Sequence, residues 1–585
     1  MFDKISTTSA LAWALHASAV AAAGFRTVGS SGCSVQMAFL PPYTDTVVFL
    51  DNYHRNFGGP GVNLETGAHS TEPYLEADGK TFVFGVEYSW KNNGLRKLNP
   101  VSNTFCSSGA FFPDGTLVNP AGAETYAGDA DASVIQDGRQ ALRYYAPGPC
   151  NGACTQDFDV HANVLQSRRW YPTALTLTNG DVVVVGGSDV GLLVTNEASI
   201  NVPSYEIIKA DRSAPPAQVD LDILKFDASD NQNANKSYNL YPILNLLPND
   251  QSADHVFTLA GNQVIVHDYS TNQQIKKLPD TPLQPRCFPS SATVVLLPLV
   301  APNYDPTILM CGGSSGDAPD PQALDDCYTI KPNDENPVWQ QDDNLPNGPQ
   351  TMTDAVLLPD GTVLMLNGAH AGSAGGYMAR DPVNQAIIYN PAAPAGQRFT
   401  KQGTTTIPRL YHSVAILLPS GEVLVAGSNP DVFYAPKGNP SINKIYPEFN
   451  NNGKVSFLHQ QQEKTVDHPT EYRVEIFSPP YMDSPSRPTI SNMPAKITYN
   501  SKFDVSASGL KGDVRVRMAY AGFRTHAVDM GQRMVELETV GSGNGTVTVT
   551  APKNASVMPP GHYLVFAVAD GIPSEGKWIS LQNGA

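Results

Sequence analysis

Four short segments of the chain carry thiol, phenol and imidazole side chains that could take part in metal and redox chemistry. In chain order they are 103–109 (NTFCSSG), 166–173 (QSRRWYPT), 409–413 (RLYHS) and 522–533 (GFRTHAVDMGQR). Two imidazoles with phenolate oxygens form a tetragonal site of the kind that suits Cu(II), whereas structural zinc sites are usually closed by thiolates. The residue types therefore favour copper, provided that the fold brings the segments together.

A repeat places three of these segments at equivalent points. A short apolar strand, usually introduced by an Asp-Gly or Asn-Gly type of turn and usually followed by glycine, occurs seven times, at 46–51, 114–118, 179–187, 262–267, 307–313, 360–368 and 420–427. The mean interval is about 63 residues, near the kelch period of about 50 residues plus loop insertions. Three of the four segments lie just upstream of a repeat, and equivalent positions of different propeller blades converge at one mouth of the ring.

The expected fold class is all-β. It consists of a seven-bladed kelch-type β-propeller over residues 24–478, followed by an immunoglobulin-like β-sandwich over 479–585. Small sheets that cannot bury both faces alone do so in a ring. After a proline-rich connector, short alternating strands such as 514–518 and 563–568 indicate the sandwich. An irregular pair of β-sandwiches is the alternative, but seven repeats with similar turn chemistry argue against it.

The composition and the N-terminal segment limit the classes of protein to which the chain can belong. The formal net charge of -17 disfavours nucleic acid and anionic membrane surfaces as partners. Residues 1–23 resemble a weak signal peptide, with an apolar run at 10–23 that ends in small residues, and no later run is long and apolar enough to span a membrane. We therefore expect a secreted protein, and three sequons, at Asn235, Asn544 and Asn554, are compatible with a glycoprotein.

The cysteine count suits an oxidising compartment. There are seven cysteines, so at least one lies outside intramolecular disulfides. Cys150 and Cys154 could close a small loop around an Asn-Gly turn, but the sequence does not choose among the pairings.

The four segments resemble those of the copper radical oxidases, the family of galactose oxidase and glyoxal oxidase. Phe-Cys, Arg-Trp-Tyr-Pro, Tyr-His-Ser and Thr-His-Ala-Val occur in the family's order, each in its expected blade or domain. The resemblance implies one copper ion, a thioether between Cys106 and Tyr171, and a ligand set made of Tyr171, Tyr411, His412 and His526. Because successive side chains of a regular strand face opposite ways, a bend or bulge must aim both Tyr411 and His412 at the metal.

The family resemblance also implies a reaction. An alcohol or hydrated aldehyde gives its hydroxyl proton to Tyr411, a Tyr171 radical removes hydrogen from carbon, and dioxygen becomes hydrogen peroxide. The chain resembles glyoxal oxidase more than galactose oxidase, because it has no room for an N-terminal carbohydrate-binding domain and because segments 196–203 and 427–430 look like those of glyoxal oxidase.

Substrate contacts are less firmly indicated. Counting from Tyr171, the tryptophan that stacks on the radical in galactose oxidase falls at Asp189, which could hydrogen-bond a small hydrated aldehyde or cap the turn after Gly187. We also place Arg169 and Trp170 around the substrate, although a surface salt bridge is the alternative for the arginine.

The expected protein is thus an extracellular, monomeric oxidase of small aldehydes such as glyoxal or methylglyoxal, which forms carboxylic acids and peroxide. Peroxide-consuming peroxidases would be its partners. Two alternatives stay open, namely oxidation of primary alcohols or galactose, and a non-catalytic kelch binding module. The second predicts no copper uptake and offers no reason for His526 to sit in the C-terminal region.

Overall fold

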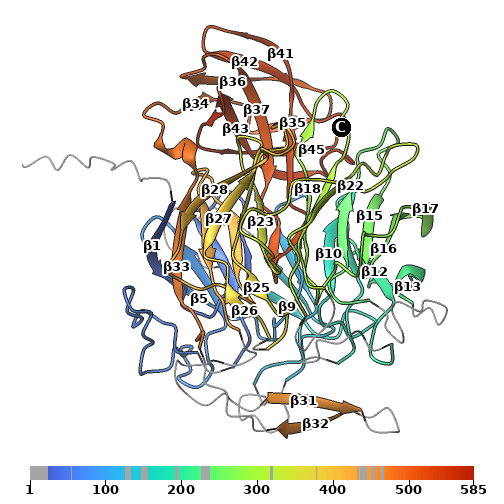
Figure 1. Cartoon of the computed structure of the whole chain (residues 1–585), viewed down its shortest axis with the longest axis vertical. Helices are drawn as coiled ribbons and strands as arrows, with labels where there is room; N and C mark the ends of the chain where they lie inside the picture. The colour runs from blue at the N-terminus through green and yellow to red at the C-terminus, as the bar shows by residue number, and fades with distance from the viewer. Residues whose placement is uncertain are drawn as a thin grey trace, which may run out of the picture.

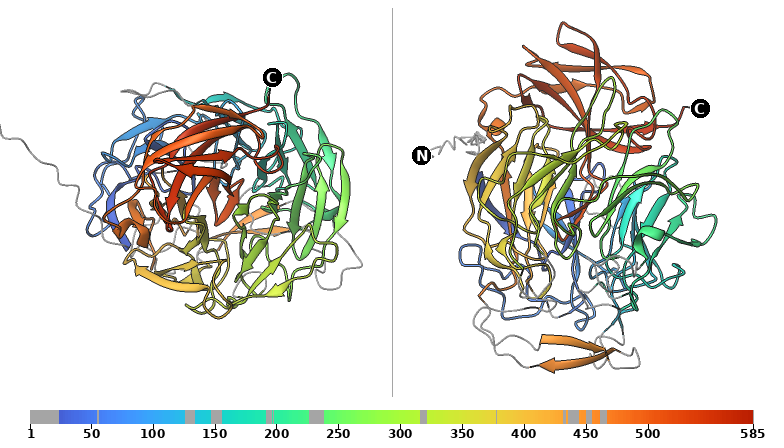
Figure 2. Two further views of the ribbon diagram at one scale, coloured as in Figure 1. Left: turned by 90° about the horizontal axis from the view of Figure 1, so that it is seen from above. Right: turned by 45° about the vertical axis from the view of Figure 1, so that its right-hand side comes forward.

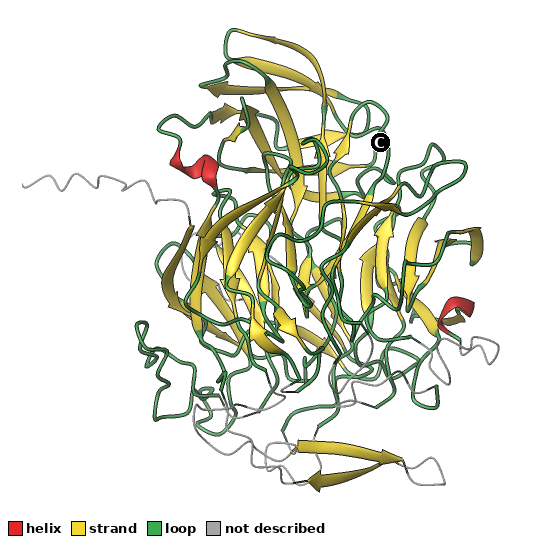
Figure 3. Cartoon of the chain, in the orientation of Figure 1, coloured by secondary structure: helices red, strands yellow, loops and turns green. Residues whose placement is uncertain are grey.

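The computed structural model describes residues 24–54, 56–125, 134–146, 156–190, 196, 198–225, 238–315, 321–376, 378–430, 434, 444–449, 455–460 and 467–584. The expected signal peptide, the Cys150–Cys154 loop and the Asn235 sequon lie outside these ranges. Within them the chain is all-β, and the helical segments are two short 3₁₀ turns, η2 (Asp222–Leu224) and η3 (Pro480–Asp483) (Figures 1 and 3). No helix in the described ranges is both long and apolar enough to cross a bilayer.

Seven sheets stand side by side around an axis and form a propeller (Figure 2). From the inner to the outer strand, the first four are β2 (Met37–Phe39), β3 (Thr46–Leu50), β4 (Gly85–Ser89), β5 (Leu95–Leu98); β6 (Ala110–Phe111), β7 (Leu117–Pro120), β8 (Leu142–Tyr145), β9 (Asp159–His161); β10 (Thr173–Thr176), β11 (Val182–Val185), β12 (Ser204–Ile208), β13 (Gln218–Asp220); and β14 (Ile243–Leu246), β15 (His255–Ala260), β16 (Gln263–Asp268), β17 (Gln273–Lys277).

The other three blades follow the same plan. They are β18 (Thr293–Leu296), β20 (Ile308–Cys311), β21 (Cys327–Ile330), β22 (Gln340–Gln341); β23 (Asp354–Leu357), β24 (Val363–Leu366), β27 (Gln385–Tyr389), β28 (Phe399–Thr404); and β29 (Val414–Leu417), β30 (Val423–Ala426), β33 (Arg473–Ser478), β1 (Gly24–Ser30). Two separate hairpins are β25 (Ala369–Ala371) with β26 (Arg380–Pro382), and β31 (Lys444–Phe449) with β32 (Val455–Gln460). The second strands of the blades, such as β11, β24 and β30, are almost fully buried, which explains their continuous apolar sequence.

The sequence repeat marks the second strand of six blades and the third strand of one. In blade 4 the copy at 262–267 is β16, whereas the second strand is β15. The turn before β15 holds Asn249 and Asp250 and has no glycine, so the motif is visible one strand later, at the Gly261-Asn262 hairpin.

The ring is closed by the two ends of the propeller chain. β1 pairs antiparallel with β33, from Gly24 opposite Ser478 to Ser30 opposite Arg473 with a shift of register between Thr27 and Gly29, and so becomes the outer strand of blade 7. The first strand of the chain therefore holds the last blade in place by a ladder of backbone hydrogen bonds.

The C-terminal region is a β-sandwich. One sheet has the order β19-β40-β37-β43-β45-β35 with β44 at its side, and the other has the order β34-β36-β42-β41. The strands are β19 (Leu299–Val300), β34 (Thr489–Asn492), β35 (Lys496–Thr498), β36 (Lys502–Ser508), β37 (Val514–Tyr520), β40 (Arg533–Glu536), β41 (Glu538–Gly543), β42 (Thr546–Thr550), β43 (Gly561–Ala569), β44 (Ile572–Pro573) and β45 (Lys577–Gln582). Figure 2 shows the sandwich seated over one mouth of the ring.

Two strand pairings help to join the sandwich to the propeller. β19, from a propeller loop, pairs in parallel with β40 of the sandwich. A hairpin of β38 (Phe523–Thr525) and β39 (Val528–Met530) extends from the sandwich and adds two strands to blade 1, with Met37 opposite Thr525. This hairpin, called the finger below, carries His526 into the ring.

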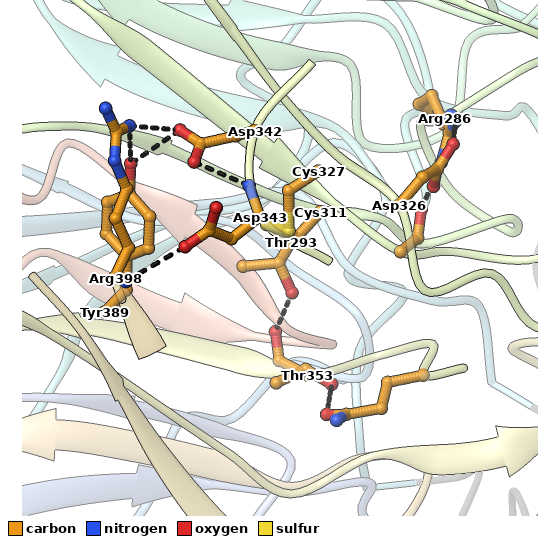
Figure 4. The surroundings of a disulfide bond; sticks show 12 residues. Arg286, Thr293, Cys311, Asp326, Cys327, Asp342, Asp343, Thr353, Tyr389 and Arg398 are labelled. Atoms are coloured by element: carbon orange, nitrogen blue, oxygen red, sulfur yellow. Dashed lines mark hydrogen bonds and ion pairs between the residues drawn. A yellow bond between two sulfur atoms is a disulfide. The ribbon is translucent and has the colours of Figure 1, made fainter. Parts of the chain in front are cut away.

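A disulfide and an ion pair stabilise blade 5, which consists of β18, β20, β21 and β22. Cys311 and Cys327 lie opposite each other in β20 and β21 and form a disulfide (Figure 4). In the same view Arg286 forms an ion pair with Asp326, 2.6 Å apart. Among the described residues, Cys33 and Cys106 are buried free thiols, and Cys287 is buried as well.

Candidate metal centre

The residues singled out in the sequence occupy one repeated position of the propeller. Cys106, Tyr171 and His412 each lie eight residues before the turn that joins the first two strands of their blade. All three have left-handed backbone angles, with φ of 55°, 62° and 63°. Non-glycine residues seldom adopt this conformation, and they do so here where the chain enters the inner strand beside the axis.

The left-handed residue brings two successive side chains to the same side. The rings of Tyr411 and His412 stack with centroids 3.7 Å apart, and those of Trp170 and Tyr171 lie 3.9 Å apart. This is the bend that the adjacency of Tyr411 and His412 predicts. Gly427 makes room for it, because a Cβ at Gly427 would lie 2.5 Å from the carbonyl oxygen of His412.

Three chemical groups meet at the axis. The hydroxyls of Tyr171 and Tyr411 are 2.7 Å apart. The Cys106 Sγ lies 3.3 Å from Nε2 of His526, and the ligand atoms of these two residues and of His412 all lie within 4.8 Å of one another. All five side chains are buried. The structure therefore gathers four segments, one of them from the finger, at a single point.

Hydrogen bonds orient both imidazoles. Nδ1 of His412 donates to the carbonyl oxygen of Asn429 at 2.7 Å, which leaves the lone pair on Nε2. Nδ1 of His526 contacts the hydroxyl of Thr525, whose own proton goes to the carbonyl oxygen of Gln36. The hydroxyl oxygen therefore accepts from Nδ1, and His526 also presents Nε2 as an electron-pair donor. Such support of the distal nitrogen is typical of metal-binding histidines.

Burial favours the neutral forms of the two phenols, the thiol and the His526 imidazole. It raises the pKa of Tyr171 and Tyr411 well above that of a free phenol, and the neighbouring Cys106 thiol raises both further. Burial also raises the pKa of Cys106, against the opposing effect of the Tyr171 and Trp170 side chains. The pKa of His526 is lowered well below its usual value by burial and by His412. Neutral imidazoles are the form that binds a metal.

This donor set fits Cu(II). Two Nε2 atoms and two phenol oxygens converge without a carboxylate among the clustered ligand atoms, and a divalent cation would stabilise the phenolates that burial alone disfavours. Cys106 adds a free thiol sulfur beside these nitrogen and oxygen donors.

Two aromatic residues at the centre were missed by the sequence analysis. Tyr241 lies 5.0 Å from the ring of Tyr171 and 5.1 Å from that of His526, and Phe288 lies 4.7 Å from the ring of Tyr171. Tyr241 has φ of 42° and occupies in blade 4 the position that Tyr171 has in blade 3. Counting eight residues back from the turn at Asn249 would have found it. Phe288 has no such signal.

The three residues predicted around the substrate lie in different surroundings. Trp170 is at the centre, against Tyr171. Arg169 lies inside the blade and not at the surface, because its fully buried guanidinium pairs with Glu206 at 3.0 Å and donates to the carbonyl oxygen of Gly186, and its place around the substrate stays a prediction. Arg286 and Arg409 make the same clamp in blades 5 and 7. Asp189 is exposed, and its carbonyl oxygen accepts a bond from Arg139. Its contact with substrate stays a prediction.

Comparison with known proteins agrees with this arrangement. Residues 36–448 match the family described as glyoxal oxidase N-terminus, and residues 487–581 match the galactose oxidase-like Early set domain. The chain is 33% identical to aldehyde oxidase GLOX of Vitis pseudoreticulata, over 92% of each chain. It is also 33% identical to aldehyde oxidase GLOX1 of Arabidopsis thaliana, over 83% of this chain and 73% of the relative. A solved fungal alcohol oxidase of the AA5 family, in complex with copper, shares the fold with a TM-score of 0.64 at 16% identity, over 95% of this chain and 98% of that one.

Proposed function

The chain belongs to the glyoxal oxidase family and is an oxidase, and we propose that it converts small aldehydes to carboxylic acids while reducing dioxygen to hydrogen peroxide. The balance is one aldehyde, one water and one dioxygen for each acid and peroxide. The single observation that carries the proposal is the 2.7 Å contact between the Tyr171 and Tyr411 hydroxyls beside the Cys106, His412 and His526 cluster.

In this proposal Tyr171, Tyr411, His412 and His526 hold one copper ion. When bound, copper acidifies a hydroxyl beside it and accepts one electron, which is the chemistry that the phenols alone lack. Tyr411 then receives the hydroxyl proton of the hydrated aldehyde at its Oη. Its pKa is raised by burial, so it serves as a base only with a cation nearby.

Tyr171 is the redox residue of the proposal. As a phenoxyl radical it removes the hydrogen atom from the substrate carbon, so that the protein supplies one of the two electron acceptors. A thioether to Cys106 would add electron density to the phenol and ease its oxidation. Three facts support the cross-link, namely the free Cys106 thiol, its effect on the pKa of Tyr171, and the hydrogen bond from the Tyr171 amide to the Cys106 carbonyl oxygen at 3.2 Å.

Small aldehydes are the favoured substrates for two reasons. The relatives that match most of the chain are named aldehyde oxidases. Three side chains packed around the phenols, Trp170, Tyr241 and Phe288, are aromatic, and the nearby Arg169 is paired with Glu206, so these residues offer no free charge to an acidic substrate.

We further propose that the protein is secreted as a monomer and passes its peroxide to peroxidases. The N-terminal segment and the disulfide between Cys311 and Cys327 support an oxidising compartment. Of the two sequons within the described residues, Asn544 is exposed in the turn between β41 and β42. Asn554 donates to the carbonyl oxygen of Asn249 and accepts from Ser556. A glycan is therefore expected on Asn544, and peptide mapping of secreted Asn544→Gln and Asn554→Gln variants tests this.

The decisive experiment measures peroxide release by copper-loaded, oxidant-activated protein with methylglyoxal and with galactose. We expect peroxide with the aldehyde and only background in Tyr171→Phe. Tyr205→Phe, which alters a buried tyrosine in the outer part of blade 3, is the matched control and should keep activity. Turnover of galactose alone would instead indicate an alcohol oxidase, and silence from fully loaded, cross-linked protein would reject the proposal for these substrates.

A further inference from the structure

Tyr241 is the third phenol of the centre, and its contacts differ from those of the other two. Its hydroxyl donates to the carbonyl oxygen of Ser107 at 3.0 Å, and its amide donates to the carbonyl oxygen of Tyr171 at 2.7 Å. Its ring also lies against His526. Tyr241 thus contacts the Cys106–Ser107 segment, Tyr171 and the finger, and it is fully buried.

The contact with Ser107 constrains Cys106. The carbonyl oxygen of Cys106 accepts from the amide of Tyr171 at 3.2 Å, and the next carbonyl along the chain accepts from the hydroxyl of Tyr241. Because each carbonyl is part of a planar peptide, holding both fixes the two peptide planes that meet at the Ser107 Cα, and the Cα of Cys106 lies in the first of these planes. Cys106 needs such support, because its φ of 55° is a conformation that non-glycine residues seldom adopt.

A second contact holds the same segment from the opposite side. Nδ2 of Asn119 donates to Oγ of Ser107 at 2.8 Å and to the carbonyl oxygen of Ser108 at 2.6 Å. The segment after Cys106 is therefore held by a side chain from its own blade and by one from blade 4. The hydroxyl of Tyr241 is one of three contacts that this segment makes with other blades, beside the Tyr171 amide on the Cys106 carbonyl oxygen and the Oγ of Ser107 on the Met37 sulfur at 3.2 Å.

We propose that Tyr241 is a positioning residue for the cross-link, whose hydroxyl holds the backbone beside Cys106 so that Sγ stays against Tyr171 while the thioether forms. This inference rests on the proposed function, because it presumes the cross-link. In that step a bond forms between Sγ and a ring carbon of Tyr171, and the S–H and ring C–H bonds break. The two electrons and two protons pass to dioxygen, which becomes hydrogen peroxide.

The test follows cross-linking by mass in protein purified without copper, then supplied with copper and air. Each cross-link removes the mass of two hydrogen atoms from a peptide pair that contains Cys106 and Tyr171. We expect Tyr241→Phe, which removes only the hydroxyl, to bind copper in the same ratio but to cross-link about fivefold more slowly, as the loss of one hydrogen bond allows. Tyr205→Phe is the control, since its hydroxyl donates to the carbonyl oxygen of Tyr269 at 3.1 Å, away from the centre.

Two further outcomes keep the inference open to refutation. Cross-linking of Tyr241→Phe at the rate of the unaltered protein would overturn it while leaving the proposed function intact. Unaltered protein that takes up copper and never loses the two hydrogens would overturn both. Should Tyr241→Phe fold poorly, Asn119→Ser, which shortens the donor that holds the same segment, must also slow cross-linking at equal copper occupancy, and an unchanged rate there would reject the proposal.

Discussion

The indole of Trp170 lies over the ring of Tyr171, with centroids 3.9 Å apart and planes inclined by 30°. The same relationship joins Tyr411 to His412 in blade 7, at 3.7 Å and 29°. In both blades the residue before the left-handed position places its ring on that of its successor. The cover over the proposed radical thus comes from the adjacent residue of the chain, and its position follows from the backbone.

Removal of this cover should shorten the lifetime of the Tyr171 radical. We expect Trp170→Leu to keep copper stoichiometry but to lose the radical about tenfold faster in the absence of substrate, because an aromatic stack contributes roughly 0.5 to 1.5 kcal/mol and also excludes water. The decay of the radical's visible absorption measures this. Trp339→Leu is the control, because Trp339 is bonded through Nε1 to the carbonyl oxygen of Pro279, away from the centre. Equal decay in both variants would contradict a shielding role for Trp170.

The finger depends on a buried charge cluster for its position. Arg524 donates to the carbonyl oxygen of Ala355 at 2.8 Å, lies 3.7 Å from Asp529 and contacts Gln532. Arg524→Met would leave the buried Asp529 carboxyl without its cation, and such losses cost about 3 kcal/mol or more. We expect that drop in the free energy of unfolding, together with weaker copper binding, since His526 lies two residues away.

Urea unfolding and copper titration measure the two effects of Arg524→Met. The matched control is Lys91→Met, which breaks an ion pair with Asp45 whose side chains are 62% and 58% exposed. Exposed pairs are worth about 1 kcal/mol or less. If Arg524→Met were as mild as Lys91→Met, the finger would not owe its position to this cluster.

The sequence predicts the residues of this centre that stand at a fixed distance, eight residues, before the turn of the repeat. Cys106, Tyr171 and His412 precede turns that carry a visible motif, and their convergence follows from blade equivalence alone. Tyr241 obeys the same register, but its turn at Asn249 lacks the glycine that reveals the others. The repeat does not predict the positions of side chains that are set by partners far away in the sequence.

Arg169 and Asp189 show why side-chain direction is harder to infer. Arg169 is adjacent to two residues of the centre, yet its partner Glu206 lies 37 residues further along, in the third strand of the blade, and draws the guanidinium into the sheet. The position of Asp189 was counted from Tyr171 through β10 and β11 into the loop that follows, and a count that ends in a loop does not preserve position in space. Phe288 reaches the centre from the connection between blades 4 and 5, where no periodic signal exists.

Asp354 should make the stability of the protein depend on pH. Burial raises its pKa to about 7, against the opposing effects of Asn367 and Arg524. The folded protein then keeps this proton up to about pH 7, whereas the unfolded chain releases it near the ordinary aspartate pKa of 3.8. Between those values the folded state binds more protons, so stability falls as pH rises, by roughly 1.4 kcal/mol per pH unit for this group, and levels off above pH 7.

Comparison with Asp354→Asn isolates this group, because other buried carboxyls titrate in both proteins. Urea unfolding at pH 5 and pH 8 should give a smaller loss of stability in the variant than in the unaltered protein. A variant that lost as much stability between the two pH values would assign the dependence to other groups, such as Asp51 or Asp529, whose pKa values burial also raises.

Removal of copper should lower the melting temperature, because an ion that binds only the folded chain stabilises it. At a free copper concentration of 100 times the dissociation constant, the gain is about 2.7 kcal/mol. We expect a chelator to abolish that gain and copper to restore it. His412→Ala should melt at the same temperature with or without copper, because it lacks one of the two nitrogen donors at the axis. His161→Ala, whose imidazole is 50% exposed beside Asp159, should respond to copper as the unaltered protein does. A full copper response in His412→Ala would place the ion elsewhere and remove the basis for the proposed ligand set.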